Sequence, residues 1–242
     1  MATAHADAWA AEGQLRQPYG GGSADLPGVR VMSSGLPFRQ WNSADLIAAD
    51  ADLDAVGRWY AARGVAWGIR VPAGIDVAPG RFLAHRHLMG LRPAGFRSPN
   101  LSAEPGFEIR RAGRGDARAT ATVDAAAFGD DPGPVLQWLE PQLADPRWRV
   151  YLAYIDGQPV GVATSTMTDD RAGPAVAVSG VGVLQSHRRK GIGAALSARA
   201  VTDGLQAGAL LAHLSPDTDE AARVYAKLGF SEVPGLDIYV DC

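Results

Sequence analysis

The segment at residues 179–195, SGVGVLQSHRRKGIGAA, constrains the fold more than any other part of this sequence. An apolar strand pattern runs to Leu184, basic residues and glycines follow at residues 188–193, and a helical pattern begins there. Glycines let backbone N–H groups approach a ligand closely. The start of a helix adds N–H donors that lack intrahelical partners, at the positive end of the helix dipole. This pattern predicts an anion site, for which a diphosphate is a suitable guest.

The same segment has other interpretations. The basic run could be a solvated helix start, and the glycines a turn. A Rossmann fingerprint, typical of nucleotide-dependent oxidoreductases, needs Gly-x-Gly-x-x-Gly directly after the strand, whereas residues 185–190 intervene here and Leu196 occupies the third glycine position. A P-loop needs Gly-x-x-x-x-Gly-Lys-Ser/Thr, and the sequence contains no such run. Both nucleotide-binding alternatives are therefore weaker than the simple anion site.

The chain after residue 107 has clear hydrophobic periodicity. It predicts strands at 107–111, 148–155, 158–167, 175–184, 210–214 and 236–240, and helices at 116–128, 135–143, 191–206 and 219–228. Asp156-Gly157 is a strong signal for a two-residue hairpin. The order β-α-α-β-β-β-α-β-α-β, with meandering strands before two helical crossovers, implies a mixed sheet in an α/β or α+β layer fold.

Two blocks in this region resemble a known family. Residues 188–193, RRKGIG, match the Arg/Gln-x-x-Gly-x-Gly/Ala motif of GNAT acetyltransferases, and residues 221–230, AARVYAKLGF, resemble the C-terminal A-x-x-x-Tyr-x-x-x-Gly-Phe block of that family. The blocks occur in the family order, with a helix and a strand between them. The resemblance covers residues 107–242. It implies a GNAT fold in which two central strands splay apart to hold the thioester of acetyl-CoA.

The resemblance also implies roles for matching residues. It implies direct transfer of an acetyl group from acetyl-CoA to a small-molecule or peptide amine in a ternary complex. The implied cofactor-binding residues are Val181, Gly182 and Val183 for the pantetheine arm and acetyl carbonyl, Arg188, Arg189, Lys190, Gly191, Ile192, Gly193 and Ala194 for the diphosphate, and Thr218. Thr218 stands where the family often has an asparagine, so its hydroxyl is expected to substitute. Gly180 and Gly182 suit a bulge that splays the strand.

Tyr225 is the implied general acid, which would protonate the departing thiolate. A phenol with a pKa near 10 keeps its proton at neutral pH; the alternative is a packed aromatic side chain on a helix face. A general base is not identified, because nothing in the sequence ranks its candidates and a water chain could serve instead. The candidates are Glu108, Asp124, Glu140 and His213. A second class of function, a non-catalytic acyl-CoA sensor, therefore remains open.

The first hundred residues are harder to interpret. We expect a flexible tail at 1–24, a smaller α/β region at 25–100 and a Pro/Gly/Ser-marked linker at 101–106, before a catalytic domain at 107–242. A helix at 52–63, a strand at 67–71 and a helix at 81–89 parallel the elements at 193–206, 210–214 and 219–228. This order suggests a degenerate GNAT-like half, which lacks the glycine-rich motif and so should not bind the cofactor. An unrelated α/β extension is the alternative.

Charge and composition exclude several classes of function. A net charge of −3 disfavours nucleic acid as the partner. No apolar stretch approaches the ~20 residues that a membrane-spanning helix requires. Cys242 is the only cysteine, which leaves neither a disulfide nor a cysteine metal site, and His85 and His87 lack a third metal ligand. We therefore expect a cytoplasmic protein without metal or membrane attachment, as a monomer or homodimer.

Overall fold

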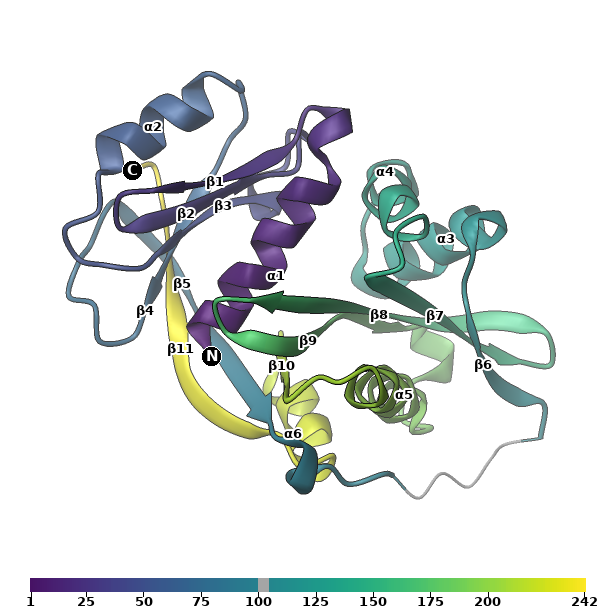
Figure 1. Cartoon of the computed structure of the whole chain (residues 1–242). Helices are drawn as coiled ribbons and strands as arrows, with labels where there is room; N and C mark the ends of the chain where they lie inside the picture. The colour runs from purple at the N-terminus through teal and green to yellow at the C-terminus, as the bar shows by residue number, and fades with distance from the viewer. Residues whose placement is uncertain (100–104) are drawn as a thin grey trace.

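A computed structural model describes residues 1–99 and 105–242 of the chain (Figure 1). Its helices are α1 (Ala2–Leu15), α2 (Leu53–Ala61), α3 (Ala117–Phe128), α4 (Pro132–Gln142), α5 (Ile192–Gln206) and α6 (Asp219–Lys227). Its strands are β1 (Gly22–Leu26), β2 (Val29–Ser33), β3 (Asn42–Leu46), β4 (Gly68–Pro72), β5 (Arg81–Leu91), β6 (Phe107–Arg111), β7 (Trp148–Ile155), β8 (Gln158–Asp170), β9 (Gly173–Val183), β10 (Leu211–Leu214) and β11 (Ser231–Val240). The strands form one mixed sheet in the order β1-β2-β3-β4-β11-β5-β10-β9-β8-β7-β6.

The predicted order of elements after residue 107 is confirmed. The structure runs β6-α3-α4-β7-β8-β9-α5-β10-α6-β11, with bounds close to those expected. Asp156 and Gly157 join β7 to β8 with φ angles of 49° and 77°. Two positive φ values at a two-residue turn match the right-handed twist of the flanking strands. Helix α5 covers one face of this part of the sheet, and α3 and α4 cover the other (Figure 1).

The helix predicted at residues 81–89 is wrong, because this segment is strand β5. Backbone pairing with two distant strands decides its conformation. Gly90 pairs with His213 of β10 on one side and with Ser231 of β11 on the other. Local periodicity carries no signal of partners so far away in the chain, and tertiary context overrides a weak local preference.

The two halves of the sheet share one strand pattern. In the first half, β1, β2 and β3 are antiparallel neighbours, and a crossover through α2 leads to β4, which is parallel to β3. In the second half, β7, β8 and β9 repeat this pattern, and α5 leads to the parallel β10. The expected match of α2 with α5 and of β4 with β10 therefore holds. The expected match to α6 fails, because β5 follows β4 there.

The two halves exchange their next strands. β11, which follows β10 and α6 in the chain, pairs with β4 of the first half. β5, which follows β4, pairs with β10 of the second half. β5 and β11 also pair with each other at the centre of the sheet. The hydrogen-bonded sheet is therefore continuous across the predicted boundary, and the predicted linker at 101–106 lies outside the described residues except for Pro105 and Gly106.

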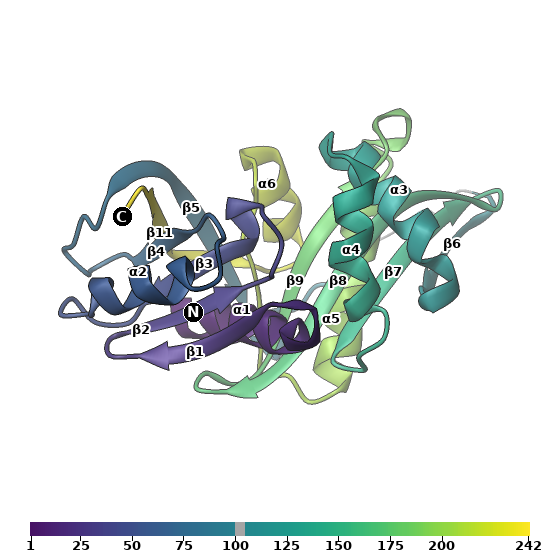
Figure 2. The same cartoon turned by 90° about the horizontal axis from the view of Figure 1, so that it is seen from above.

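The flexible tail predicted at residues 1–24 is also wrong. Residues 2–15 form α1, which lies across the sheet between the two halves (Figure 2), and residues 22–26 form β1. The buried alanines of α1 are Ala4, Ala6, Ala10 and Ala11. Alanine is the strongest helix former, and its small side chain lets the helix approach the sheet closely. The alanine-rich composition that suggested a tail is thus what packs this helix.

A buried ion pair ties α1 to the second half. Arg16 Nε donates to Glu12 Oε1 at 2.7 Å, and both side chains are almost fully buried. Glu12 Oε2 also accepts from Gln142 Nε2 and Trp148 Nε1 at 2.9 and 3.1 Å. Burial raises the pKa of Glu12, even though Arg16 acts to lower it. The pair therefore carries a large desolvation cost that only its hydrogen-bonded partners offset.

Breaking this pair should be far more damaging than removing both charges. Arg16→Met leaves a buried carboxylate without its cation, so the free energy of unfolding should fall by about 3–5 kcal/mol. The double variant Glu12→Gln/Arg16→Met should lose less than Arg16→Met alone. Guanidinium denaturation followed by tryptophan fluorescence measures both. Arg110→Met is the control, because Arg110 pairs with Glu108 at an exposed site, where such pairs contribute about 0–1 kcal/mol. Equal losses for the Arg16 and Arg110 variants would contradict the argument.

Candidate functional site

Strand β9 separates from β10 halfway along its length. The two strands pair in parallel only from Ala175 to Ala177, opposite Leu211 to His213, within the described chain. Beyond them, the register between β9 and β8 shifts at the expected bulge, where Gly180 has a φ of 57°. The rest of β9, through Val183, is paired with β8 on one side and open on the other. The predicted splayed strands are therefore present.

The glycine-rich loop connects the open part of β9 to α5. Arg189 and Gly191 both have left-handed backbone conformations, with φ angles of 67° and 79°. A non-glycine residue at positive φ is uncommon and costs about 1 kcal/mol. The first-turn N–H groups of Ile192, Gly193 and Ala194 have no intrahelical carbonyl to bond to. A strained loop that ends on a helix N-terminus forms a concave set of N–H donors, which suits an anion.

Two of the three basic side chains of the loop, Arg188 and Arg189, make different contacts. Arg188 donates from Nε to the Val183 carbonyl at 3.1 Å and from Nη2 to the Ala127 carbonyl at 2.9 Å. It therefore ties the end of β9 to the end of α3. Arg189 lies in solvent and pairs with Glu220 of α6 at 3.2 Å. The sequence predicted one shared role, binding of the diphosphate, for Arg188, Arg189 and Lys190. It could not predict the bond from Arg188 to α3, because the Ala127 carbonyl lies 61 residues away in the chain.

Residues of β9 face different neighbours on its two sides. A Cβ atom built on Gly193 would lie 3.8 Å from Val183 Cγ2 and 3.9 Å from Val181 Cγ1, so these valines border the start of α5. A Cβ on Gly182 would lie 2.8 Å from Ala127 Cβ, so glycine is required there by the packing of α3. The predicted cofactor residues Val181, Val183 and Gly193 are thus brought together. Gly182 contacts α3 on the opposite face of β9.

Tyr225 lies close to the glycine-rich loop. It is 8% exposed and packs edge-to-face on Phe230, with ring centroids 6.0 Å apart. Burial, and then the charge of Asp217, raise the pKa of its phenol to about 12, while the nearby Ser197 hydroxyl acts to lower it. Ser197 in turn donates to the carbonyl of Gly193 at 2.8 Å. Ser197 thus lies between the phenol and the first turn of α5.

Thr218 is the N-cap of α6. Its Oγ1 accepts a hydrogen bond from the Ala221 N–H at 3.1 Å. Asp217, the residue before the cap, pairs instead with Arg86 of β5. The Thr218 hydroxyl keeps its own proton to donate, so a cofactor contact stays a prediction.

The four candidate bases lie in different surroundings. Glu108 is exposed on the edge strand β6 and pairs with Arg110 at 2.8 Å. Glu140 is exposed on α4. His213 is fully buried, and burial lowers its pKa to about 4. Asp124 of α3 is half-buried beside Gly180 of β9. The structure therefore distinguishes the four candidate bases by their burial and their partners, whereas the sequence could not rank them.

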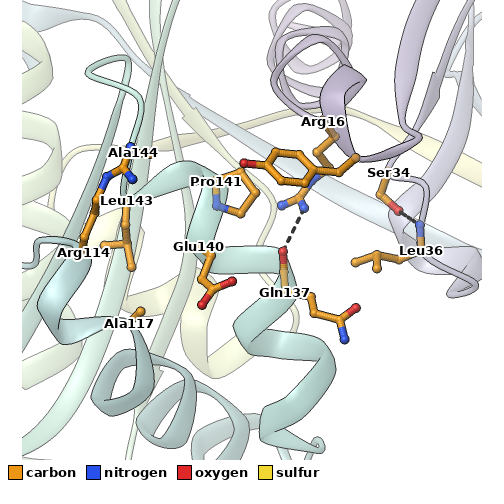
Figure 3. Close-up of a pocket in the computed structure, with 11 residues that line it drawn as sticks. Arg16, Ser34, Leu36, Arg114, Ala117, Gln137, Glu140, Pro141, Leu143 and Ala144 are labelled. Atoms are coloured by element: carbon orange, nitrogen blue, oxygen red, sulfur yellow. Dashed lines mark hydrogen bonds between the residues drawn. The ribbon is translucent and has the colours of Figure 1, made fainter.

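A cavity lies between the two halves of the chain (Figure 3). Its volume is about 410 Å³. Arg16 and Ser34 line it on one side, and Arg114, Gln137 and Glu140 on the other. It borders the beginning of α3, whereas Ala127 and the loop lie at the end of that helix. Arg16 is already engaged with the Gln137 carbonyl, at 3.2 Å.

Neither a metal cluster nor a membrane-spanning helix occurs among the described residues. No cluster of three metal-binding side chains occurs among residues 1–99 and 105–242. Within the same ranges, every helix is too short or too polar to cross a bilayer.

Comparisons with known proteins agree with this geometry. A family model described as acetyltransferase (GNAT) matches residues 117–230. A GCN5-related N-acetyltransferase from Kribbella flavida is 22% identical, with 95% of this chain and 94% of that chain covered and a TM-score of 0.70. A GNAT-family acetyltransferase from Novosphingobium aromaticivorans is 20% identical, with 98% of each chain covered and a TM-score of 0.61. A GCN5-related N-acetyltransferase from Sphaerobacter thermophilus is 20% identical, with 87% and 75% covered and a TM-score of 0.58.

These structural likenesses establish the fold over nearly the whole chain, including the first half. A search of curated protein sequences gave no match. The splayed strands, the glycine-rich loop and the match of the family model fall in the same segment. Residues 117–230 of this protein therefore form an acetyltransferase domain of the GNAT family.

Proposed function

We propose that the protein transfers an acetyl group from acetyl-CoA to an amine acceptor by direct attack. The observation that carries this proposal is the loop from Arg188 to Gly193, which presents helix N–H donors beyond the end of the part of β9 that has separated from β10. The diphosphate of acetyl-CoA would accept hydrogen bonds from these donors and gain from the dipole of α5. The open edge of β9 would pair with the pantetheine arm as an added strand does.

The residues present fit this cofactor. The first turn of α5 at Gly193 lies against Val181 and Val183 of β9, and a Cβ atom at residue 193 would make only ordinary van der Waals contacts. Bound there, acetyl-CoA supplies an activated thioester carbonyl. A backbone N–H near Val183 would stabilise the negative charge on the carbonyl oxygen during attack. The chain's only cysteine, Cys242, packs beside Gly80 near β5, which favours direct attack over an acyl-enzyme.

Tyr225 would protonate the departing thiolate. Burial and Asp217 raise its pKa to about 12, so the phenol holds its proton at every pH at which an amine reacts. Ser197, which lies near the phenol and donates to the Gly193 carbonyl, would help to orient the ring toward the loop. A proton delivered to sulfur converts the departing thiolate into the free thiol of CoA.

A negative charge at residue 193 should weaken cofactor binding without unfolding the domain. Gly193→Asp places a carboxylate where only ordinary van der Waals contacts exist, and an acidic residue in the first turn favours the helix. Repulsion of the diphosphate should weaken acetyl-CoA binding at least about tenfold, since 1.4 kcal/mol is one factor of ten and unit charges ~4 Å apart interact by more than that. Isothermal titration calorimetry with acetyl-CoA measures this loss.

Gly193→Ala is the matched control for that experiment. It adds the same Cβ without charge, so its affinity should stay close to the wild-type value. Absence of binding by the wild-type protein itself would overturn the proposed function. Binding without release of CoA to any amine would instead identify a non-catalytic acyl-CoA sensor.

Removing the phenol should slow the chemistry while leaving binding intact. Tyr225→Phe keeps the ring that packs on Phe230, so stability and acetyl-CoA affinity should be nearly unchanged. Loss of a general acid typically costs a factor of about 10²–10⁴, so kcat should fall at least about a hundredfold. Thiol release monitored with a chromogenic disulfide gives kcat. Tyr239→Phe on β11 is the control, and equal kcat values for the two variants would rule out the acid role.

A further inference from the structure

Asp124 borders the bulge that opens the site. A Cβ atom built on Gly180 would lie 3.6 Å from Asp124 Oδ2 and 4.0 Å from Thr164 Oγ1. Gly180 follows the last paired residues of β9 and β10 by three positions. The carboxylate therefore reaches the point where the strands part, from the face that α3 covers. Helix α5, with the proposed cofactor site, covers the opposite face (Figure 1).

Asp124 is half-buried and has no hydrogen bond or ion pair with any residue in the described ranges. Burial, and then the like charge of Asp130, raise the pKa of this carboxyl to about 7. A carboxylate that is desolvated and unpaired gains by binding a proton or a cation. In the folded protein, Asp124 thus changes charge in the range where a catalytic base is most effective.

Few other charges face Asp124 from the elements packed on α3. Strand β9 carries no ionisable residue. On α4 the ionisable residue is Glu140, which lines the cavity at the other end of α3. On β8, Asp169 and Asp170 lie at the far hairpin, where Asp170 pairs with Arg30. The guanidinium of Arg188 binds the Ala127 carbonyl nearby and is held there by its two hydrogen bonds.

We propose that Asp124 is the group that accepts a proton from the acceptor amine, which approaches the bulge at Gly180 from the α3 face of the sheet. This inference rests on the proposed acetyl transfer. The carboxylate suits an acceptor that arrives as an ammonium ion, which can form an ion pair with it. Glu108 is exposed on the edge strand β6, and Glu140 lines the cavity at the other end of α3. His213, with its pKa lowered to about 4, is too weak a base.

The protons balance in this scheme. Asp124 takes one proton from the ammonium and later releases it to water. The free amine attacks the thioester carbon, the C–N bond forms and the C–S bond breaks. Tyr225 protonates the thiolate, and the second proton lost by the nitrogen restores the phenol through water. The net reaction is R–NH₃⁺ plus acetyl-CoA to R–NH–acetyl plus CoA–SH plus H⁺.

The first test compares Asp124→Asn with Glu108→Gln in CoA release. The wild-type protein is screened with lysine, spermidine, tyramine and an alanyl dipeptide, and the best acceptor is used. Asp124→Asn should lower kcat/KM for this amine by about 10²-fold or more at neutral pH and remove the acidic limb of the pH profile, while the affinity for acetyl-CoA is unchanged. Glu108→Gln should match the wild type. Full activity of Asp124→Asn with an unchanged pH profile would overturn the inference and leave the proposed function standing.

The second test needs no acceptor. Carboxyl-carbon NMR of aspartate-labelled protein, assigned by the loss of one signal in Asp124→Asn, gives the titration midpoint of Asp124. The midpoint should lie near 7 and should shift to lower pH in Asp130→Asn, because that variant removes the like charge. The acidic limb of kcat/KM should shift in the same direction. A titration midpoint in the ordinary carboxyl range would overturn the assignment, even if acetyl-CoA binding and turnover are intact. So would an acidic limb of kcat/KM that does not shift in Asp130→Asn.

Discussion

The backbone pairing between β5 and β11 is the constraint on which the rest of the structure depends. Each strand continues one half of the chain but completes the sheet of the other. β10 therefore receives hydrogen bonds from β5 on one edge, opposite Met89 to Leu91. Because that edge is satisfied, β10 can leave β9 after three residue pairs without becoming an unpaired edge strand. The opening that defines the candidate site is thus supported by a strand from the half that lacks the glycine-rich loop.

The opening also separates two kinds of chemistry across one strand. On the α5 face, β9 meets a helix N-terminus whose donors suit an anion. On the α3 face, the same strand meets an unpaired carboxyl that suits a cation. Arg188 connects the two faces by bonding to Val183 of β9 and Ala127 of α3. A change in its geometry would move both faces at once, so this residue positions the site although its side chain already has protein partners.

The sequence was most informative where local signals and a family motif coincide. After residue 107 the strands and helices were predicted in order, because hydrophobic period, turn residues and the loop motif agree. It was least informative where the partner is distant in the chain. β5 appeared helical because its neighbours lie beyond residue 210, and the role of Arg188 depends on a carbonyl of α3. The alanine-rich start appeared mobile because nothing local shows the sheet surface that α1 covers.

The strand exchange has a consequence for synthesis on the ribosome. The edge of β4 that faces β11 has no hydrogen-bonding partner until residues 236–240 of β11 have been synthesised. A chain that emerges from its first residue onward cannot complete its first half until nearly all of the second half has been made. In the meantime, the exposed edge of β4 is open to pairing with another nascent chain. A fold that pairs strands so far apart in the sequence is expected to form slowly. Termination of synthesis before β11 would leave β4 of the first half without its neighbouring strand.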